Sequence, residues 1–127
     1  MIVDTVAGIF VRRGRVLVEK RRADDPADPG LTVIPGGHVN PGELLEIALR
    51  REMREELGIR VGKMRLVLKR LYTASNGERQ RIHYFHVVEW KGRIRSREAE
   101  TVYWEPRIAN LSGSPERRIV RRLLKSR

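Results

Sequence analysis

Runs of apolar residues separated by short polar stretches fill the first part of the chain, a composition typical of strands. Val, Ile and Phe dominate residues 3–22, and the pair Arg13-Gly14 interrupts them where a glycine can supply a turn. We therefore expect two strands joined by a tight turn. A loop rich in Asp, Pro and Gly follows over residues 23–31, and a short strand over residues 32–39 is broken by a proline and two glycines.

The apolar spacing then changes to a helical period. Residues 42–57 are predicted to form a helix, and Gly58 stands where a glycine commonly ends one. On a helical wheel that advances by ~100° per residue, one apolar stripe forms. It consists of Leu45, Leu49, Met53 and Leu57. We expect this stripe to face the core.

The second half of the chain repeats the strand pattern and ends in another helix. Strand-like runs over residues 65–75 and 79–90 flank Asn76-Gly77, a pair typical of hairpin turns. A further strand is expected within residues 98–106. The closing helix over residues 114–127 begins with a candidate N-terminal cap and a proline. Its apolar stripe is Ile119, Val120, Leu123 and Leu124. This order of strands and helices predicts one mixed α/β domain over residues 1–127.

The amino-acid composition limits which cellular compartment and which binding partners we expect for this protein. Lys and Arg number 27 against 16 Asp and Glu, so the net charge is +11. Such a surplus favours polyanions as partners, namely nucleotides, nucleic acid or an anionic membrane surface, although a generally charged, soluble surface explains it equally well. The absence of cysteine excludes disulfides, thiol catalysis and cysteine metal sites, and suits the cytoplasm. No apolar run approaches the ~20 residues that span a bilayer.

Five acids crowd onto the first predicted helix and its approach. They are Glu43, Glu46, Glu52, Glu55 and Glu56. Ion pairs one turn apart, such as Arg51 with Glu55, account for some of them. They do not account for Glu52 and Glu56, which the wheel places beside the apolar stripe. Two carboxylates there repel each other and lose hydration, so we expect a cation between them. Arg51 can serve one carboxylate, and a divalent metal suits the cluster better.

The glycines before the helix support a metal site. Gly36 and Gly37 have no Cβ, so their backbone can approach a ligand or an ion closely. A peptide carbonyl from this turn would complete an oxygen-rich shell with the helix carboxylates. Mg²⁺ and Mn²⁺ prefer such ligands. We therefore predict an Mg²⁺ or Mn²⁺ site where the glycine turn meets the acidic helix.

The same stretch resembles the signature motif of the Nudix hydrolases. Its fixed positions are filled by Gly37, Glu43, Arg51, Glu52, Met53, Glu55, Glu56, Gly58 and Ile59. The resemblance implies a mixed β-sheet sandwiched between helices. It also implies hydrolysis of a nucleoside diphosphate linked to another group, with Mg²⁺ or Mn²⁺. The nucleotide is then the expected partner, and nucleic acid is not favoured.

The resemblance also implies a role for each residue that fills a fixed position of the motif. Gly37 (through its carbonyl), Glu52, Glu55 and Glu56 are the implied metal ligands. Glu43 and Gly58 are implied to shape the motif. The implied catalytic residues are Glu52, Glu55, Arg51 and Glu98. Arg51 would hold the motif together with Glu43. Glu98 corresponds to the acid that a distant loop supplies in related enzymes, and its alternative interpretation is a solvated loop acid.

Several residues outside the motif have two interpretations. The aromatic residues Tyr72, Tyr84, Phe85 and Trp104 either stack on a base or pack in the core and sheet. Basic residues near the first turn, including Arg21 and Arg22, either contact phosphates or face water. His38, His83 and His86 are not spaced as a metal triad.

The expected reaction is cleavage of a nucleoside triphosphate into a monophosphate and pyrophosphate. ADP-ribose and dinucleoside polyphosphates are the alternative substrates, and a Nudix fold that binds nucleotide or RNA without cleavage is the alternative class. Oxidised-guanine specialists in the family carry an Asn just before the last helix, whereas this chain has Asn110 earlier and serines nearer the helix. Both a monomer and a homodimer are compatible with the sequence.

Overall fold

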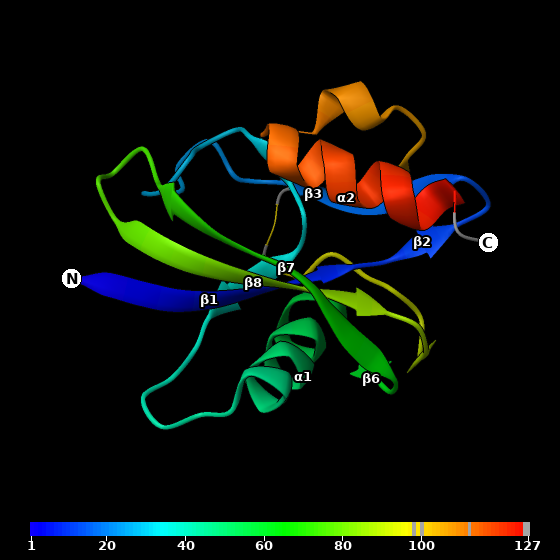
Figure 1. Ribbon diagram of the computed structural model, residues 1–127, viewed down its shortest axis with the longest axis horizontal. Coiled ribbons are helices and arrows are strands. Elements are labelled where there is room, and N and C mark those ends of the chain that lie inside the picture. Colours follow the sequence, from blue (N-terminus) through cyan, green and yellow to red (C-terminus); the bar gives the residue numbers. More distant parts are fainter. Residues whose placement is uncertain (98, 100, 112, 126–127) are drawn as a thin grey trace.

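The computed structural model describes residues 1–97, 99, 101–111 and 113–125 (Figure 1). Its strands are β1 (Ile2–Ile9), β2 (Val11–Arg12), β3 (Arg15–Lys20), β4 (Thr32–Val33), β5 (Gly36–His38), β6 (Arg60–Val61), β7 (Met64–Thr73), β8 (Arg79–Val87), β9 (Trp90–Lys91) and β10 (Thr101–Glu105). Its helices are α1 (Leu45–Leu57), α2 (Ser114–Lys125) and a short 3-10 turn, η1 (Ile108–Asn110).

The central sheet has the strand order β5-β1-β8-β7. β1 and β8 run parallel, and the outer pairs are antiparallel. A second sheet has the order β10-β3-β2, with β4 also paired to β3, and β6 pairs β9. Helix α1 lies on one side of the central sheet and α2 on the other (Figure 1). The predicted fold class, a mixed sheet sandwiched between helices, is therefore confirmed.

Alternation along β1 divides the core between the two helices. Val6 packs in the apolar cluster that contains the buried face of α1, whereas Ala7 and Ile9 pack in the cluster that contains α2. On α1, three of the four residues of the predicted apolar stripe are fully buried and the remaining one, Leu45, is partly buried. The helical period thus identified the buried face of α1 correctly.

Several predicted boundaries differ from the structure. The strand predicted over residues 79–90 ends at Val87, and Trp90 belongs to β9. The first strand-like run does not continue to the Arg13-Gly14 turn, because it leaves the central sheet after Ile9 and enters the second sheet as β2. The turn itself is present, with positive φ angles of 52° and 77°, as a two-residue hairpin turn requires. Helix α1 begins at Leu45 rather than Gly42, since Gly42 adopts a left-handed φ of 75° that a helix cannot contain.

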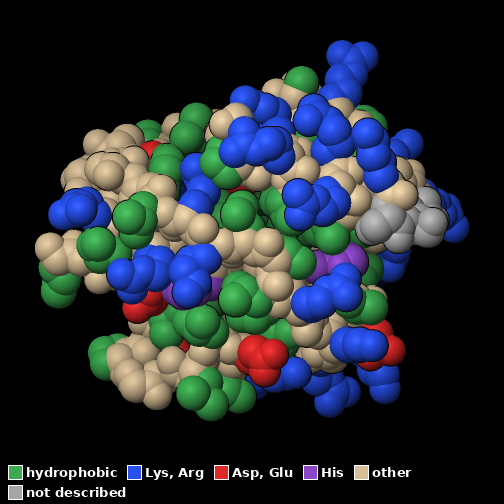
Figure 2. Space-filling model, in the orientation of Figure 1, with side chains coloured by type: hydrophobic (Ala, Val, Ile, Leu, Met, Phe, Trp, Pro, Cys, Tyr) green, Lys and Arg blue, Asp and Glu red, His purple; other side chains and the backbone are tan. Residues whose placement is uncertain are grey.

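The surface is strongly basic. Figure 2 shows Lys and Arg side chains spread over the face that α2 covers. Basic residues of α2, namely Arg118, Arg121, Arg122 and Lys125, line a shallow depression there. Neither helix in the described residues is long and apolar enough to cross a membrane.

Candidate active site

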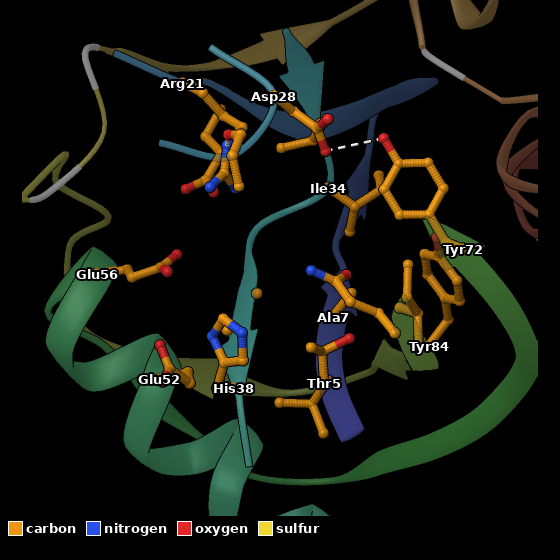
Figure 3. Close-up of a pocket in the computed structure, with 18 of the residues that line it drawn as sticks. Thr5, Ala7, Arg21, Asp28, Ile34, His38, Glu52, Glu56, Tyr72 and Tyr84 are labelled. Atoms are coloured by element: carbon orange, nitrogen blue, oxygen red, sulfur yellow. Dashed lines mark hydrogen bonds between the residues drawn. The ribbon is translucent and has the colours of Figure 1, made fainter. Parts of the chain in front are cut away.

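An open pocket of about 400 Å³ lies beside β1, between α1 and the loop that follows β3. Figure 3 shows Glu52 and Glu56 on the α1 side of this pocket and Tyr72 and Tyr84 on the opposite side. Thr5 of β1 lies between the two sides. One end of the pocket is therefore acidic, and the other is lined by aromatic rings. We call them the acidic end and the aromatic end.

At both glycines of β5, a side chain would collide with a neighbouring group. A Cβ on Gly36 would lie 2.1 Å from the carbonyl oxygen of Val6, because β5 pairs closely with β1. A Cβ on Gly37 would lie 2.2 Å from the Glu52 carboxylate carbon. The expectation that this turn permits a close approach is met by Glu52 itself. Gly37 thus allows backbone and carboxylate to meet at the wall of the pocket.

Arg51 connects the loop before α1 to the helix and to β5. Its Nε and Nη2 donate to the two carboxylate oxygens of Glu43, each at 2.8 Å. Nη2 also donates to the His38 carbonyl at 2.8 Å. Nη1 donates to Glu52 at 2.8 Å and to Glu55 at 2.9 Å. A single guanidinium therefore fixes three carboxylates and the end of β5 relative to one another.

The hydrogen bonds of this network favour the ionised forms of Glu43 and Arg51. The bond from Arg51, followed by the Asn40 N–H, lowers the pKa of Glu43 to about 2. Hydrogen bonds to Glu43, Glu55 and Glu52 raise the pKa of Arg51. Both partners therefore remain ionised at neutral pH.

The acidic end of the pocket has the donors that a divalent metal needs. Glu52 and Glu56 come from successive turns of α1, both line the pocket, and Glu56 is only 9% exposed. Among the described residues, no three His, Cys, Asp or Glu side chains converge to hold a metal. Mg²⁺ commonly uses one or two carboxylates together with substrate phosphates and water. Two carboxylates that line the same pocket as Gly37 fit that pattern.

The predicted site residues do not all lie in the pocket. Gly37, Glu52 and Glu56 line it. Glu55 is half-exposed, is absent from the described lining, and accepts from Arg51. Glu98 lies outside the described residues. Gly58 ends α1 in the left-handed conformation, with φ at 73°, as the sequence predicted.

The predicted catalytic and metal-binding roles of these residues stay predictions, because contacts within the protein do not show what each group does to a substrate. The contacts do divide the predicted site residues into two sets. Glu52 and Glu56 face the pocket, whereas Glu43 and Arg51 hold the surrounding backbone.

Two buried acids of the pocket escaped the sequence analysis. Glu19 of β3 is 5% exposed, lies on the same side of the strand as Leu17, and ends a run of four consecutive buried residues. Glu116 of α2 is also 5% exposed. It precedes Ile119 and Val120 by three and four positions and therefore belongs to the apolar stripe of that helix. The sequence did hold a signal for these two residues, because each is an acid on the side of its strand or helix that carries buried apolar residues.

A clasp holds the loop after β3 over the pocket. The Tyr72 hydroxyl donates to Asp28 Oδ2 at 2.8 Å, and Ser75 N donates to Oδ1 at 2.8 Å. Asp28 N in turn donates to Ser75 Oγ at 2.7 Å. Burial and the Asp28 carboxylate raise the pKa of Tyr72 to about 12. Arg21 and Arg22, which precede the loop, also line the pocket, and Arg21 donates to Ala27 O at 2.8 Å and to Asp25 at 3.0 Å.

At the aromatic end, Tyr84 is fully buried and its ring belongs to the α2 cluster of the core. Its hydroxyl donates to Glu116 Oε2, and Arg70 Nε donates to the same hydroxyl at 3.1 Å. The guanidinium of Arg70 also lies 5.0 Å from the ring centre of Tyr72. Of the two interpretations of Tyr84, core packing is thus correct for the ring, and the residue also belongs to the lining of the pocket.

Comparisons with known proteins agree with this architecture. The sequence model of the NUDIX domain matches residues 2–122. The chain is 33% identical over 103 residues to the CTP pyrophosphohydrolase of Escherichia coli strain K12, which covers 81% of this chain and 75% of that protein. It is 30% identical over 101 residues to the 8-oxo-dGTP diphosphatase of Buchnera aphidicola, with 78% and 73% covered. The crystal structure of a MutT NUDIX hydrolase from Burkholderia pseudomallei superposes with a TM-score of 0.80 at 27% identity, over 94% of this chain and 95% of that one.

Proposed function

Because the chain belongs to the Nudix hydrolase family, whose members cleave pyrophosphate bonds in nucleotides, we propose that it converts a nucleoside triphosphate into a nucleoside monophosphate and pyrophosphate. The observation that carries this proposal is the division of one pocket into an acidic end, with Glu52 and Glu56, and an aromatic end, with Tyr72 and Tyr84. A nucleotide has the same division, with phosphates at one end and a base at the other.

The acidic end would bind the phosphates through a divalent metal, either Mg²⁺ or Mn²⁺. Glu52 and Glu56 would hold it, together with the carbonyl of Gly37. When bound, such an ion neutralises phosphate charge, polarises phosphoryl oxygens and acidifies water. Without that ion, the two carboxylates would repel a triphosphate.

The side chains of the protein have distinct tasks in this scheme. A carboxylate of α1 accepts the proton of the attacking water. The hydrogen bond of 2.8 Å from Arg51 to Glu52 Oε1, which holds this side chain at the pocket, supports Glu52 for the task. Arg51 is a positioning residue, since its guanidinium already contacts Glu43 and Glu55. Arg21 and Arg22 at the rim of the pocket supply positive charge for the outer phosphates.

Two features favour a triphosphate over ADP-ribose. Two relatives, each aligned over more than three quarters of this chain, are named for nucleoside triphosphate substrates, CTP and 8-oxo-dGTP. A triphosphate also gives a metal more phosphate oxygens for less bulk than a second ribose does.

The test is product identification by chromatography. The protein is incubated with nucleoside triphosphates, ADP-ribose and a dinucleoside polyphosphate, each with Mg²⁺, with Mn²⁺ and with a chelator. We expect monophosphate and pyrophosphate from a triphosphate in the presence of metal alone. A higher kcat/KM for ADP-ribose, with AMP and ribose phosphate as products, would overturn the substrate. No metal-dependent product from any nucleotide would favour a binding module instead.

A further inference from the structure

The net charge of +11 is not explained by the pocket, and part of it lies on the outer side of α2. Every residue of α2 after Ser114 that is exposed to solvent is basic. We call these residues the basic row, and they are Arg118, Arg121, Arg122 and Lys125. Their side chains line one shallow depression, on the face where Figure 2 shows many Lys and Arg side chains.

The basic row has no counter-charge on its own helix. The one acid of α2, Glu116, is buried. In the part of the chain that the structure describes, no member of the row takes part in an ion pair. Members of the row follow one another at three or four positions, so neighbouring cations repel along one face of the helix. The row therefore destabilises α2 unless an external anion compensates it.

The position of the row within the helix explains only half of it. Cations in the last turn of a helix interact favourably with the helix dipole, and Arg122 and Lys125 lie in that turn. Arg118 and Arg121 lie before it and gain little from this effect. Their presence beside two further cations indicates a surface that binds a polyanion.

The apolar side of α2 is already occupied, which distinguishes between two kinds of polyanion. Ile119, Val120 and Leu123 pack in the core with exposed fractions of at most 7%. A helix that binds an anionic membrane surface inserts apolar side chains between the lipids, in addition to placing cations near the head groups. On α2 these side chains are not available. The row thus fits a polyanion that is bound through its charges alone, namely the phosphate backbone of nucleic acid.

The composition and shape of the row favour a DNA duplex. Proteins that bind single strands stack the bases on aromatic side chains, and no described residue that lines the depression is aromatic. The row extends about 10 Å along a helix that rises ~1.5 Å per residue. Helix α2 lies on the outside of the fold (Figure 1). The major groove of B-form DNA admits an α-helix, whereas the major groove of an RNA duplex is narrow.

We propose that the basic row of α2 is a docking surface for the phosphate backbone of double-stranded DNA, bound without regard to sequence. Three of its four members are arginines, whose guanidinium groups make paired hydrogen bonds with phosphate oxygens. None of the four belongs to the described lining of the nucleotide pocket, so DNA bound there leaves the acidic end open.

Fluorescence anisotropy of a labelled DNA duplex of mixed sequence tests the proposal. If the row contacts about four phosphates, the affinity of the wild type should fall about 100-fold between about 50 and 200 mM salt. Arg121→Gln/Arg122→Gln removes two cations with little change in helix propensity. We expect this variant to bind about 10- to 100-fold more weakly at about 100 mM salt, and its salt dependence to be smaller by about two contacts.

Arg60→Gln/Lys63→Gln is the matched control. It removes the same charge from two exposed positions beside α1, on the other side of the molecule (Figure 1), and should nearly keep the wild-type affinity. Equal losses in the two variants would assign binding to net charge and overturn the proposal. Melting curves check that each variant is folded. If Arg121→Gln/Arg122→Gln does not fold, Arg118→Gln/Lys125→Gln neutralises the other half of the row and decides in its place.

Other polyanions at the same salt concentration test the choice of partner. They are the single strand of the same sequence, an RNA duplex of that sequence, and vesicles that contain phosphatidylserine. We expect each to bind more weakly than the DNA duplex. Equal or tighter binding of any of them, or no binding of the duplex at about 50 mM salt, would overturn the proposal. These measurements require no turnover, so their outcome is independent of the proposed hydrolysis.

Discussion

Arg51 donates two parallel hydrogen bonds of 2.8 Å to the carboxylate of Glu43, which precedes it by eight residues. The pair joins the loop before α1 to the second turn of the helix. The remaining donors of Arg51 reach Glu52, Glu55 and the end of β5. The geometry of the acidic end thus depends on one planar, fork-shaped side chain.

Arg51→Lys should lower both the melting temperature and kcat, because an ammonium cannot make the same set of bonds. We expect a loss of about 1–3 kcal/mol in the free energy of unfolding and a fall in kcat with little change in KM. Urea unfolding and steady-state kinetics measure these quantities. Arg54→Lys, at an exposed position of the same helix, is the control and should change neither. A change in KM alone would make Arg51 a substrate ligand rather than a positioning residue.

Glu56→Gln should remove much of the stabilisation that a metal confers. Millimolar Mg²⁺ or Mn²⁺ is expected to raise the melting temperature of the wild type, because an ion that binds only the folded state stabilises it by mass action. The variant keeps the size of the side chain but loses its charge, so the shift should shrink and kcat should fall by orders of magnitude. Glu46→Gln, in the exposed first turn of α1, should retain the wild-type shift. Equal shifts in wild type and Glu56→Gln would reject Glu56 as a metal ligand.

The two adjacent glycines of β5 should respond differently to alanine. In Gly36→Ala the new methyl group meets the Val6 backbone at 2.1 Å, so the strand pairing must shift and stability should fall strongly. In Gly37→Ala it meets the Glu52 carboxylate at 2.2 Å, a flexible group that can move aside, so kcat should fall far more than stability. Gly62→Ala, whose nearest contact would be 3.4 Å, is the control. Melting curves and kcat separate the two outcomes, and similar losses of stability in both variants would contradict the difference.

Asp4→Asn should destabilise the protein in a pH-dependent way. Asp4 accepts from His83 Nε2 at 3.0 Å and from Arg81 at 3.3 Å, and the His83 bond is the main cause that lowers the pKa of Asp4 in the folded state. The folded state therefore binds a proton less readily than the unfolded chain. The stabilisation is present above the unfolded pKa of about 4 and is lost as the pH falls through the lower folded value.

Asp4 is partly exposed, and solvent screening limits the expected difference between wild type and Asp4→Asn to about 0.5–1 kcal/mol near pH 6. The difference should diminish steadily toward pH 3. Urea unfolding across this range measures it. A constant difference at every pH would assign the effect of the substitution to packing instead of charge.

The sequence predicted what depends on local spacing. The buried stripe of α1, its terminal glycine and the turn at Asn76-Gly77 follow from periodicity and from the conformational freedom of glycine. The sequence indicated that the backbone at Gly37 permits a close approach by another group. It did not indicate that this group is the Glu52 carboxylate.

The aromatic end of the pocket was not predictable in this way, because its parts are distant along the chain. Tyr84 and Glu116 are 32 positions apart, and Tyr72 and Asp28 are 44 positions apart. Their contacts depend on the parallel pairing of β1 with β8 and on the side of the sheet that α2 covers. Alternation marks such residues as buried, and the tertiary fold alone brings them together.

The placement of α1 and α2 on opposite sides of one sheet has a consequence for how this enzyme can diversify. The carboxylates of the acidic end belong to α1, while Glu116 and its anchors belong to α2 and the strands beneath it. Because the two ends are carried by different elements, the effects of substitutions at one end and at the other should add. A lineage could therefore change the wall of the pocket through α2, β7 and β8 while inheriting α1 and its carboxylates unchanged.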